Sequence, residues 1–205
     1  MTTKLENPKS HVERGYDIVA DQYLAWTSPR QTPVRTGLVT DLLKNLPAGA
    51  DVLELGCGAG VPCTQVLVDH GLIATLIHGD MLTLDFAQAS FDAVLAFYSI
   101  FHLPKEEQVL MIAKIKGWLK PGGWVLCNFQ EDAGDMTYEG WFNFKPSITM
   151  FSSGLGVEGT RDLLNKQGFK LAVDEVMIDE VDIETVGQAE ERFHWVMAQK
   201  GDVHD

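Results

Sequence analysis

The sequence predicts an α/β fold built on a mainly parallel sheet, and two stretches carry that prediction. A short apolar run at 52–55 breaks into a glycine turn and is followed by a helical pattern from 61 to 70. A second apolar run at 93–98 is followed by another helical pattern and then by a third run at 124–129. Short apolar runs alternating with helices are typical of buried parallel strands joined by crossovers.

Composition limits the class of protein. A chain of 205 residues suits one domain, and its net charge of −13 without a basic cluster argues against a nucleic-acid partner. The three cysteines show no CxxC spacing, so no metal site and no disulfide framework are expected. The start lacks an apolar signal core and no run reaches about 18 apolar residues, so we expect a cytoplasmic protein without a membrane partner.

Two helices are predicted before the first strand. Apolar residues at helical spacing indicate one helix over 10–26, where Ser10 and Glu13 have the spacing of a capping box. The second is expected over 36–46 and ends before Pro47.

The first strand carries an acid where an apolar residue is expected. Glu54 stands one residue before the end of the run, and a carboxylate is costly to bury without partners. The stretch from Glu54 to Gly60 resembles motif I of the class I S-adenosylmethionine (SAM) dependent methyltransferases. A dinucleotide-binding fingerprint would instead place its third glycine five residues after Gly56, where this chain has Val61.

The resemblance implies a cofactor site around this turn. In that family the glycine turn contacts the amino-acid end of SAM, and the acid orders the loop around the methionine part. Carried over to this chain, those positions are Glu54, Gly56, Cys57, Gly58 and Gly60.

The N-terminal helix is similar to a segment found in many small-molecule methyltransferases. The matching residues run from Tyr16 to Tyr23 as Tyr-Asp-x-x-Ala-x-x-Tyr. The resemblance implies that this helix lies over the cofactor and that Tyr23 belongs to the pocket. A plain amphipathic helix with both tyrosines in the core is the alternative.

The family pattern is interrupted after the glycine turn. Family members have two strands there. The first ends in an acid that binds the ribose, and the second ends in a Gly-Asp-Met-like turn at the adenine. This chain has one strand-like run in their place, Leu72–Ile77. The residue types at Asp80 and Met81 match the second of these turns. The number of residues that separate Asp80 from the glycine turn instead matches the ribose-binding acid. The comparison with the family therefore predicts that about one strand and one helix are missing.

Two outcomes of this deletion are open. Leu72–Ile77 could occupy the vacated position beside the first strand, because unpaired buried backbone groups are costly. Asp80 would then lie near the ribose. Alternatively, the deletion leaves a cofactor pocket that binds SAM poorly, and the protein is a methyltransferase relative that no longer catalyses the reaction.

The segment after the second strand, 97–102, is expected to face the same crevice as the glycine turn. The resemblance implies cofactor contact for Phe97. His102 is a candidate general base, since histidine titrates near neutrality. A histidine bonded to nearby backbone is the alternative.

The remaining chain is predicted to be a cover and a hairpin. The turn Leu119–Gly123 is another hallmark of the family, and 130–156 is interpreted as an irregular segment that covers an apolar acceptor or forms a satellite cluster. A helix over 158–167 precedes strands at 169–176 and 192–198, with a solvated connector between them. These strands fit the antiparallel hairpin that ends the family's sheet.

The resemblance covers most of the chain and implies a single domain, residues 1–205, with a three-layer Rossmann-like class I methyltransferase sheet, shortened by about one strand and one helix. Within it, 10–47 would cover the cofactor cleft, 51–129 would bind SAM, and 157–200 would complete the sheet. The function it implies is methyl transfer from SAM to a small-molecule acceptor. A non-catalytic binding protein is the alternative, and a homodimer could cover the exposed sheet edge.

Overall fold

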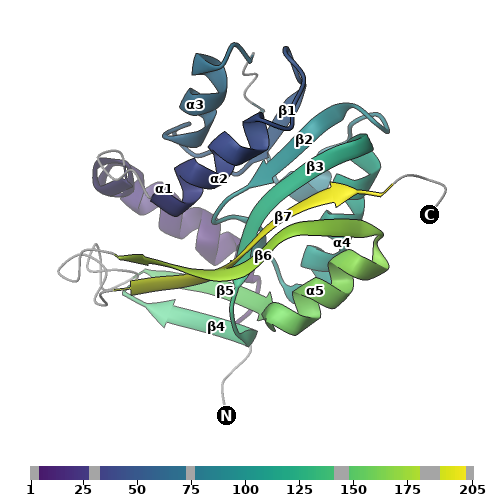
Figure 1. Ribbon diagram of the computed structural model, residues 1–205. Helices are drawn as coiled ribbons and strands as arrows, with labels where there is room; N and C mark the ends of the chain where they lie inside the picture. The colour runs from purple at the N-terminus through teal and green to yellow at the C-terminus, as the bar shows by residue number, and fades with distance from the viewer. Residues whose placement is uncertain (1–4, 28–32, 73–76, 141–147, 181–189, 202–205) are drawn as a thin grey trace.

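The computed structural model describes five stretches of the chain, residues 5–27, 33–72, 77–140, 148–180 and 190–201. Its centre is a five-stranded sheet with the order β1-β2-β3-β7-β6 (Figure 1). The strands are β1 (Val52–Leu55), β2 (Phe91–Ala96), β3 (Leu119–Gln130), β7 (Glu190–Lys200) and β6 (Phe169–Glu180).

One strand of this sheet, β7, runs opposite to the other four. β1, β2 and β3 run parallel, and the tips of the first two are in register through Leu55 and Ala96. β7 is antiparallel to both β3 and β6. The structure thus confirms the α/β class and the C-terminal antiparallel hairpin.

Side chains of β2 explain why this sheet needs helices on both faces. Val94 and Ala96 join one apolar cluster, whereas Ala93 and Leu95 join another, and all four are fully buried. Because successive side chains of a strand point to opposite faces, a strand that is apolar throughout must be covered twice.

Helices from different parts of the chain provide the two covers (Figure 1). α4 (Lys105–Trp118) and α5 (Gly156–Lys166) pack on one face through residues such as Ile112, Ile115 and Leu164. α2 (Pro33–Leu43) and α3 (Cys63–Asp69) pack on the other through residues such as Leu42 and Leu67. This arrangement gives the predicted three layers.

Residues 130–156 differ from the prediction. Where an irregular segment was expected, β4 (Ala133–Glu139) and β5 (Thr149–Leu155) form a separate antiparallel pair. Its apolar side chains pack against α1 (Pro8–Thr27), which crosses at Gly15, where an added Cβ would lie 2.4 Å from the sulfur of Met150. The prediction was wrong because strand pairing satisfies the backbone of a segment whose sequence carries no clear alternation.

The start of the first helix and the start of β3 also differ from the prediction. α1 begins at Pro8, and Ser10 lies within its first turn, where its hydroxyl donates to the carbonyl of Asn7. The capping-box prediction was therefore wrong, since proline already suits the first helical position. Residues 120–123, predicted as a turn, form an irregularity inside β3, which pairs with β2 on both sides of it.

The two ends of the sheet bear on other predictions. β6 and β7 extend to Glu180 and Glu190, so both ends of the predicted acidic connector belong to the hairpin. Among the described residues β1 pairs only with β2. The predicted strand Leu72–Ile77 includes residues 73–76, which lie outside the described part of the chain.

Within the stretches that the structure describes, no helix is long and apolar enough to cross a membrane.

Candidate functional site

A cavity of about 510 Å³ lies where the parallel strands β1 and β2 end. The carboxyl edge of a parallel sheet is where α/β folds hold their ligands. α1 lines this cavity as well. The lining residues come from α1, α2, the end of β1, the start of α3 and the segments after the two strands: Val12, Tyr16, Asp17, Ala20, Asp21, Tyr23, Leu24, Thr27, Arg35, Glu54, Gly56, Cys57, Gly58, Ala59, Val61, Cys63, Met81, Phe97, Tyr98, Ser99 and His102.

The glycine turn forms one wall because its backbone approaches the end of β2 closely. Gly56 has φ +72°, and a Cβ at this position would lie 2.6 Å from the Cβ of Ser99. Gly58 also has a left-handed φ, +55°, but a Cβ there would meet no atom within 4 Å. The first glycine is required for packing, whereas the second leaves open space at the wall of the cavity.

Glu54 is held at the tip of β1 by a hydroxyl. Thr64 Oγ1 donates to Glu54 Oε2 at 2.5 Å. Burial raises the pKa of the carboxyl, while the hydrogen bond from Thr64 and the charge of Arg35 act in the opposite direction. The predicted acid is thus one member of a polar group that includes the cation Arg35.

Arg35 reaches the cavity from the first turns of α2. Its guanidinium carbon lies 5.4 Å from the ring centroid of Tyr98, within the range of a cation–π contact. Its Nε is buried without a hydrogen-bond partner. A buried donor in this state indicates a missing acceptor, because an unsatisfied polar group costs free energy.

The segment after β2 turns sharply around Tyr98. This residue has φ +50°, and its backbone N–H donates to the Oδ1 of the fully buried Asn128 at 2.8 Å. A bulky residue in the left-handed region is strained, and such strain is found at functional sites. The turn brings Ser99, which is 6% exposed and has an unpartnered Oγ, into the cavity wall.

His102 makes hydrogen bonds through both ring nitrogens. Nδ1 lies 2.6 Å from the carbonyl oxygen of Phe151 on β5, and Nε2 lies 3.1 Å from the hydroxyl of Tyr16 on α1. Because a carbonyl only accepts, Nδ1 carries the proton, and Tyr16 donates to Nε2. Burial lowers the pKa of His102 to about 4 despite the bond to Phe151, and burial raises the pKa of Tyr16. The pair is therefore neutral near pH 7.

This arrangement makes His102 poorly suited to act as the general base that the sequence suggested. A base with a pKa of about 4 holds a proton weakly, and its accepting nitrogen is already occupied. The histidine instead orients the Tyr16 hydroxyl and links α1 to β5. Of the two readings considered for this residue, the geometry favours the one in which it bonds to nearby backbone.

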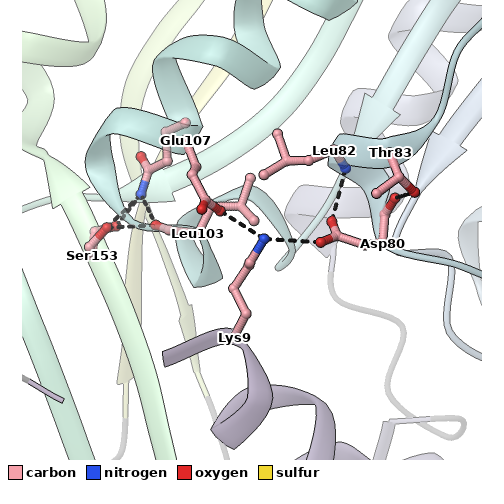
Figure 2. A network of polar contacts seen from close by, with 8 residues as sticks. Lys9, Asp80, Leu82, Thr83, Leu103, Glu107 and Ser153 are labelled. Carbon is pink, nitrogen blue, oxygen red and sulfur yellow. Dashed lines mark hydrogen bonds and ion pairs between the residues drawn. The ribbon is translucent and has the colours of Figure 1, made fainter. Parts of the chain in front are cut away.

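Asp80 lies outside the set of lining residues. Its Oδ1 accepts from the N–H of Leu82 at 2.9 Å, and its Oδ2 pairs with Lys9 at 3.0 Å. Figure 2 shows Lys9 reaching from α1 between Asp80 and Glu107 of α4, with the second ion pair at 3.1 Å. Burial alone would raise the pKa of Asp80, but the bonds from Leu82 and Lys9 lower it overall. In this structure the carboxylate fastens the start of α1.

Most predicted site residues lie together, and two do not. Gly60 and Asp80 lie outside the lining; Gly60 closes the turn by donating its N–H to the carbonyl of Cys57 at 2.9 Å. The predicted positions that line the cavity are Tyr23, Glu54, Gly56, Cys57, Gly58, Met81, Phe97 and His102. Their roles toward a ligand stay predictions.

Sequence reasoning missed several lining residues that carry polar groups. Ser99 was within the segment expected at the crevice but was not singled out, whereas Arg35 and the acids of α1 stand in helical patterns that do not distinguish them from solvated residues. The described residues contain no group of three or more histidine, cysteine or acidic side chains placed to hold a metal ion.

Two comparisons based on sequence find methyltransferases. A family model described as a methyltransferase domain matches residues 63–123. A protein of Encephalitozoon cuniculi, named as a candidate methyltransferase, is 30% identical over 148 residues, which cover 58% of this chain and 70% of that protein.

Two solved structures share the fold at low sequence identity. The 1,6-didemethyltoxoflavin-N1-methyltransferase of Burkholderia thailandensis, solved with bound 1,6-didemethyltoxoflavin and S-adenosylhomocysteine, gives a TM-score of 0.67 at 16% identity and covers 98% of this chain and 94% of that one. Magnesium protoporphyrin IX methyltransferase of Synechocystis, solved with SAM, gives 0.66 at 14% identity and covers 98% and 100%.

Proposed function

The chain belongs to the class I SAM-dependent methyltransferase family, and from that premise we propose that it transfers the methyl group of SAM to a small-molecule acceptor, leaving S-adenosylhomocysteine. One observation carries the proposal. The motif I residues Glu54, Gly56 and Gly58 line a single cavity with the polar residues that end β2.

The residues present fit the cofactor. The methionine part of SAM ends in a carboxylate, and Arg35 offers a buried Nε that lacks an acceptor. The open space beside Gly58 allows backbone and ligand to approach closely. Met81 and Phe97 add apolar surface to the same wall, which suits a nucleoside. When bound, SAM supplies an electrophilic methyl group on its sulfonium.

The chain's own contribution is positioning. Methyl transfer requires the acceptor atom, the methyl carbon and the sulfur to be aligned more than it requires a base. α1 contributes lining residues to the cavity, and the bond from Tyr16 to His102 holds a hydroxyl at its wall. Glu54, ordered by Thr64, would orient the methionine part.

The size and charge of the site favour a small acceptor. A cavity of about 510 Å³ that must also hold the cofactor leaves room for a small molecule. The net charge of −13 disfavours a nucleic acid, which would require a phosphate-neutralising surface.

Calorimetric titration with SAM and S-adenosylhomocysteine tests the proposal. We expect both ligands to bind the wild-type protein, and we expect Gly58→Leu to weaken binding about 100-fold or more, because the new side chain would project into the open space at the cavity wall. The matched control is Gly49→Leu. Gly49 has a similar left-handed φ of +72° and open surroundings but lies away from the cavity, so its variant should bind normally.

The non-catalytic alternative predicts a different result. No heat of binding at millimolar ligand in a folded protein would refute the cofactor site and favour a binding protein that only retains the fold. Equal affinities of wild type and Gly58→Leu would show that the ligand binds elsewhere.

A further inference from the structure

The charges that line the cavity divide into two groups. Glu54 and Arg35 lie near the glycine turn, close enough for each to affect the other electrostatically. Their opposite charges offset each other. The remaining charged lining residues are Asp17 and Asp21, both on α1 and both exposed. Counting the described lining residues, the α1 side of the cavity therefore carries a negative charge of about two units that none of their cations offsets.

Asp17 and Asp21 have no ion-pair partner among the described residues. They stand four residues apart on one helix, so their side chains are neighbours on the same face. Within the described part of the chain, no ion pair or hydrogen bond reaches either carboxylate. Like charges at this spacing destabilise a helix, and no local compensation offsets them. A bound cation would supply it.

Aromatic rings and the unpartnered hydroxyl of Ser99 line the same cavity as these acids. Tyr16 and Tyr23 line the same cavity with their ring centroids 5.5 Å apart in an edge-to-face arrangement. Aromatic faces attract ammonium groups. Independently, Ser99 is more than nine-tenths buried in the wall with an Oγ that has no partner, which leaves a hydrogen-bonding group for a ligand.

We infer that the acceptor is a small organic amine that reaches the cavity as an ammonium ion. This inference rests on the proposed methyltransferase function and adds the class of its substrate. Asp17 and Asp21 attract the ammonium group, and the tyrosine rings receive its carbon skeleton. The acidic chain as a whole favours the same charge.

The chemical step balances without a further reactant. The ammonium group first loses one proton to solvent water, which frees the nitrogen lone pair. That pair forms the new bond to the methyl carbon, and the electron pair of the broken carbon–sulfur bond stays on sulfur as a neutral thioether. The product is a methylated ammonium ion, so no buried base has to take the proton, which agrees with the low pKa of His102.

The test uses three matched probes on protein saturated with S-adenosylhomocysteine: tyramine, which is cationic, 2-(4-hydroxyphenyl)ethanol, which is neutral, and 3-(4-hydroxyphenyl)propionate, which is anionic. We expect tyramine to bind about tenfold more tightly than the propionate, with the alcohol between them. In Asp17→Asn/Asp21→Asn this preference should fall to about twofold or less. The control Glu6→Gln/Glu13→Gln removes two N-terminal charges outside the cavity lining and should keep it.

Each other outcome overturns the inference. Binding of the propionate as tight as tyramine would do so, as would no binding of any probe at millimolar concentration or a preference that survives Asp17→Asn/Asp21→Asn. If that variant weakens SAM but not S-adenosylhomocysteine and leaves the probes unchanged, the acids serve the sulfonium instead. Failure of S-adenosylhomocysteine itself to bind the wild type would refute the proposed function, so the two failures are distinguishable.

Discussion

The glycine turn after β1 and the cover formed by α1 enclose the same cavity, but different interactions hold them in place. The turn depends on backbone conformation and on one close approach, between Gly56 and Ser99. The cover depends on side chains far apart in the sequence, through Tyr16 with His102 and Lys9 with its two carboxylates.

The difference indicates how each region can change. A backbone turn with a required glycine tolerates little substitution, because any Cβ meets atoms that cannot move far. A cover held by polar pairs can be altered in steps, since each pair contributes a modest free energy. Ligand identity is therefore more easily changed through α1 than through the turn.

The largest effect on stability is expected at the turn. Gly56→Ala should lower the free energy of unfolding by about 3 kcal/mol, because it combines a left-handed φ with a Cβ contact of 2.6 Å. Gly49→Ala, with the same φ of +72° but open surroundings, should cost about 1 kcal/mol. Urea unfolding measures both. Equal losses would mean that the turn has no packing requirement beyond its backbone conformation.

The second-largest effect is expected at His102, which bonds to Tyr16 of α1 and should make the free energy of unfolding depend on acid pH. Folding lowers the pKa of His102 from 6.5 to about 4, so between these values the unfolded chain binds a proton that the folded chain does not. The free energy of unfolding should therefore fall by about 3 kcal/mol more, as the pH drops from 6.5 to 4, than it would without this group.

Denaturation of variants at a series of pH values isolates this histidine. His102→Gln should remove that part of the acid slope, even if it changes the stability at neutral pH. An identical slope in wild type and His102→Gln would show that His102 titrates normally and that its environment is wetter than the structure indicates.

The smallest effect is expected at the ion pairs of Lys9. Lys9→Ala should lower the free energy of unfolding by about 0.5–1 kcal/mol at low salt, because partly exposed pairs are weak and screened. Lys44→Ala breaks a more exposed pair with Asp41 and should cost less. Unfolding at low and high salt compares the two. A loss at Lys9 that does not change with salt would indicate packing rather than charge.

The prediction from sequence was accurate where local pattern dictates structure. Continuous apolar runs identified β1 and β2, and the glycines marked the turn because few residues adopt a left-handed φ. It was wrong for 130–156, where β4 and β5 pair. The alternation in β4 is weak, and β5 is buried along most of its length, so neither shows the pattern of a half-exposed strand.

By itself the sequence determined the α/β class, the family and the placement of an acid beside a glycine turn, because these follow from residue order within short segments. Only the tertiary structure decided that Arg35 and Ser99 present unpartnered groups at the cavity, that Asp80 pairs with Lys9, and that His102 is neutral. These properties depend on burial and on partners many residues away, and spacing along a chain contains no measure of either.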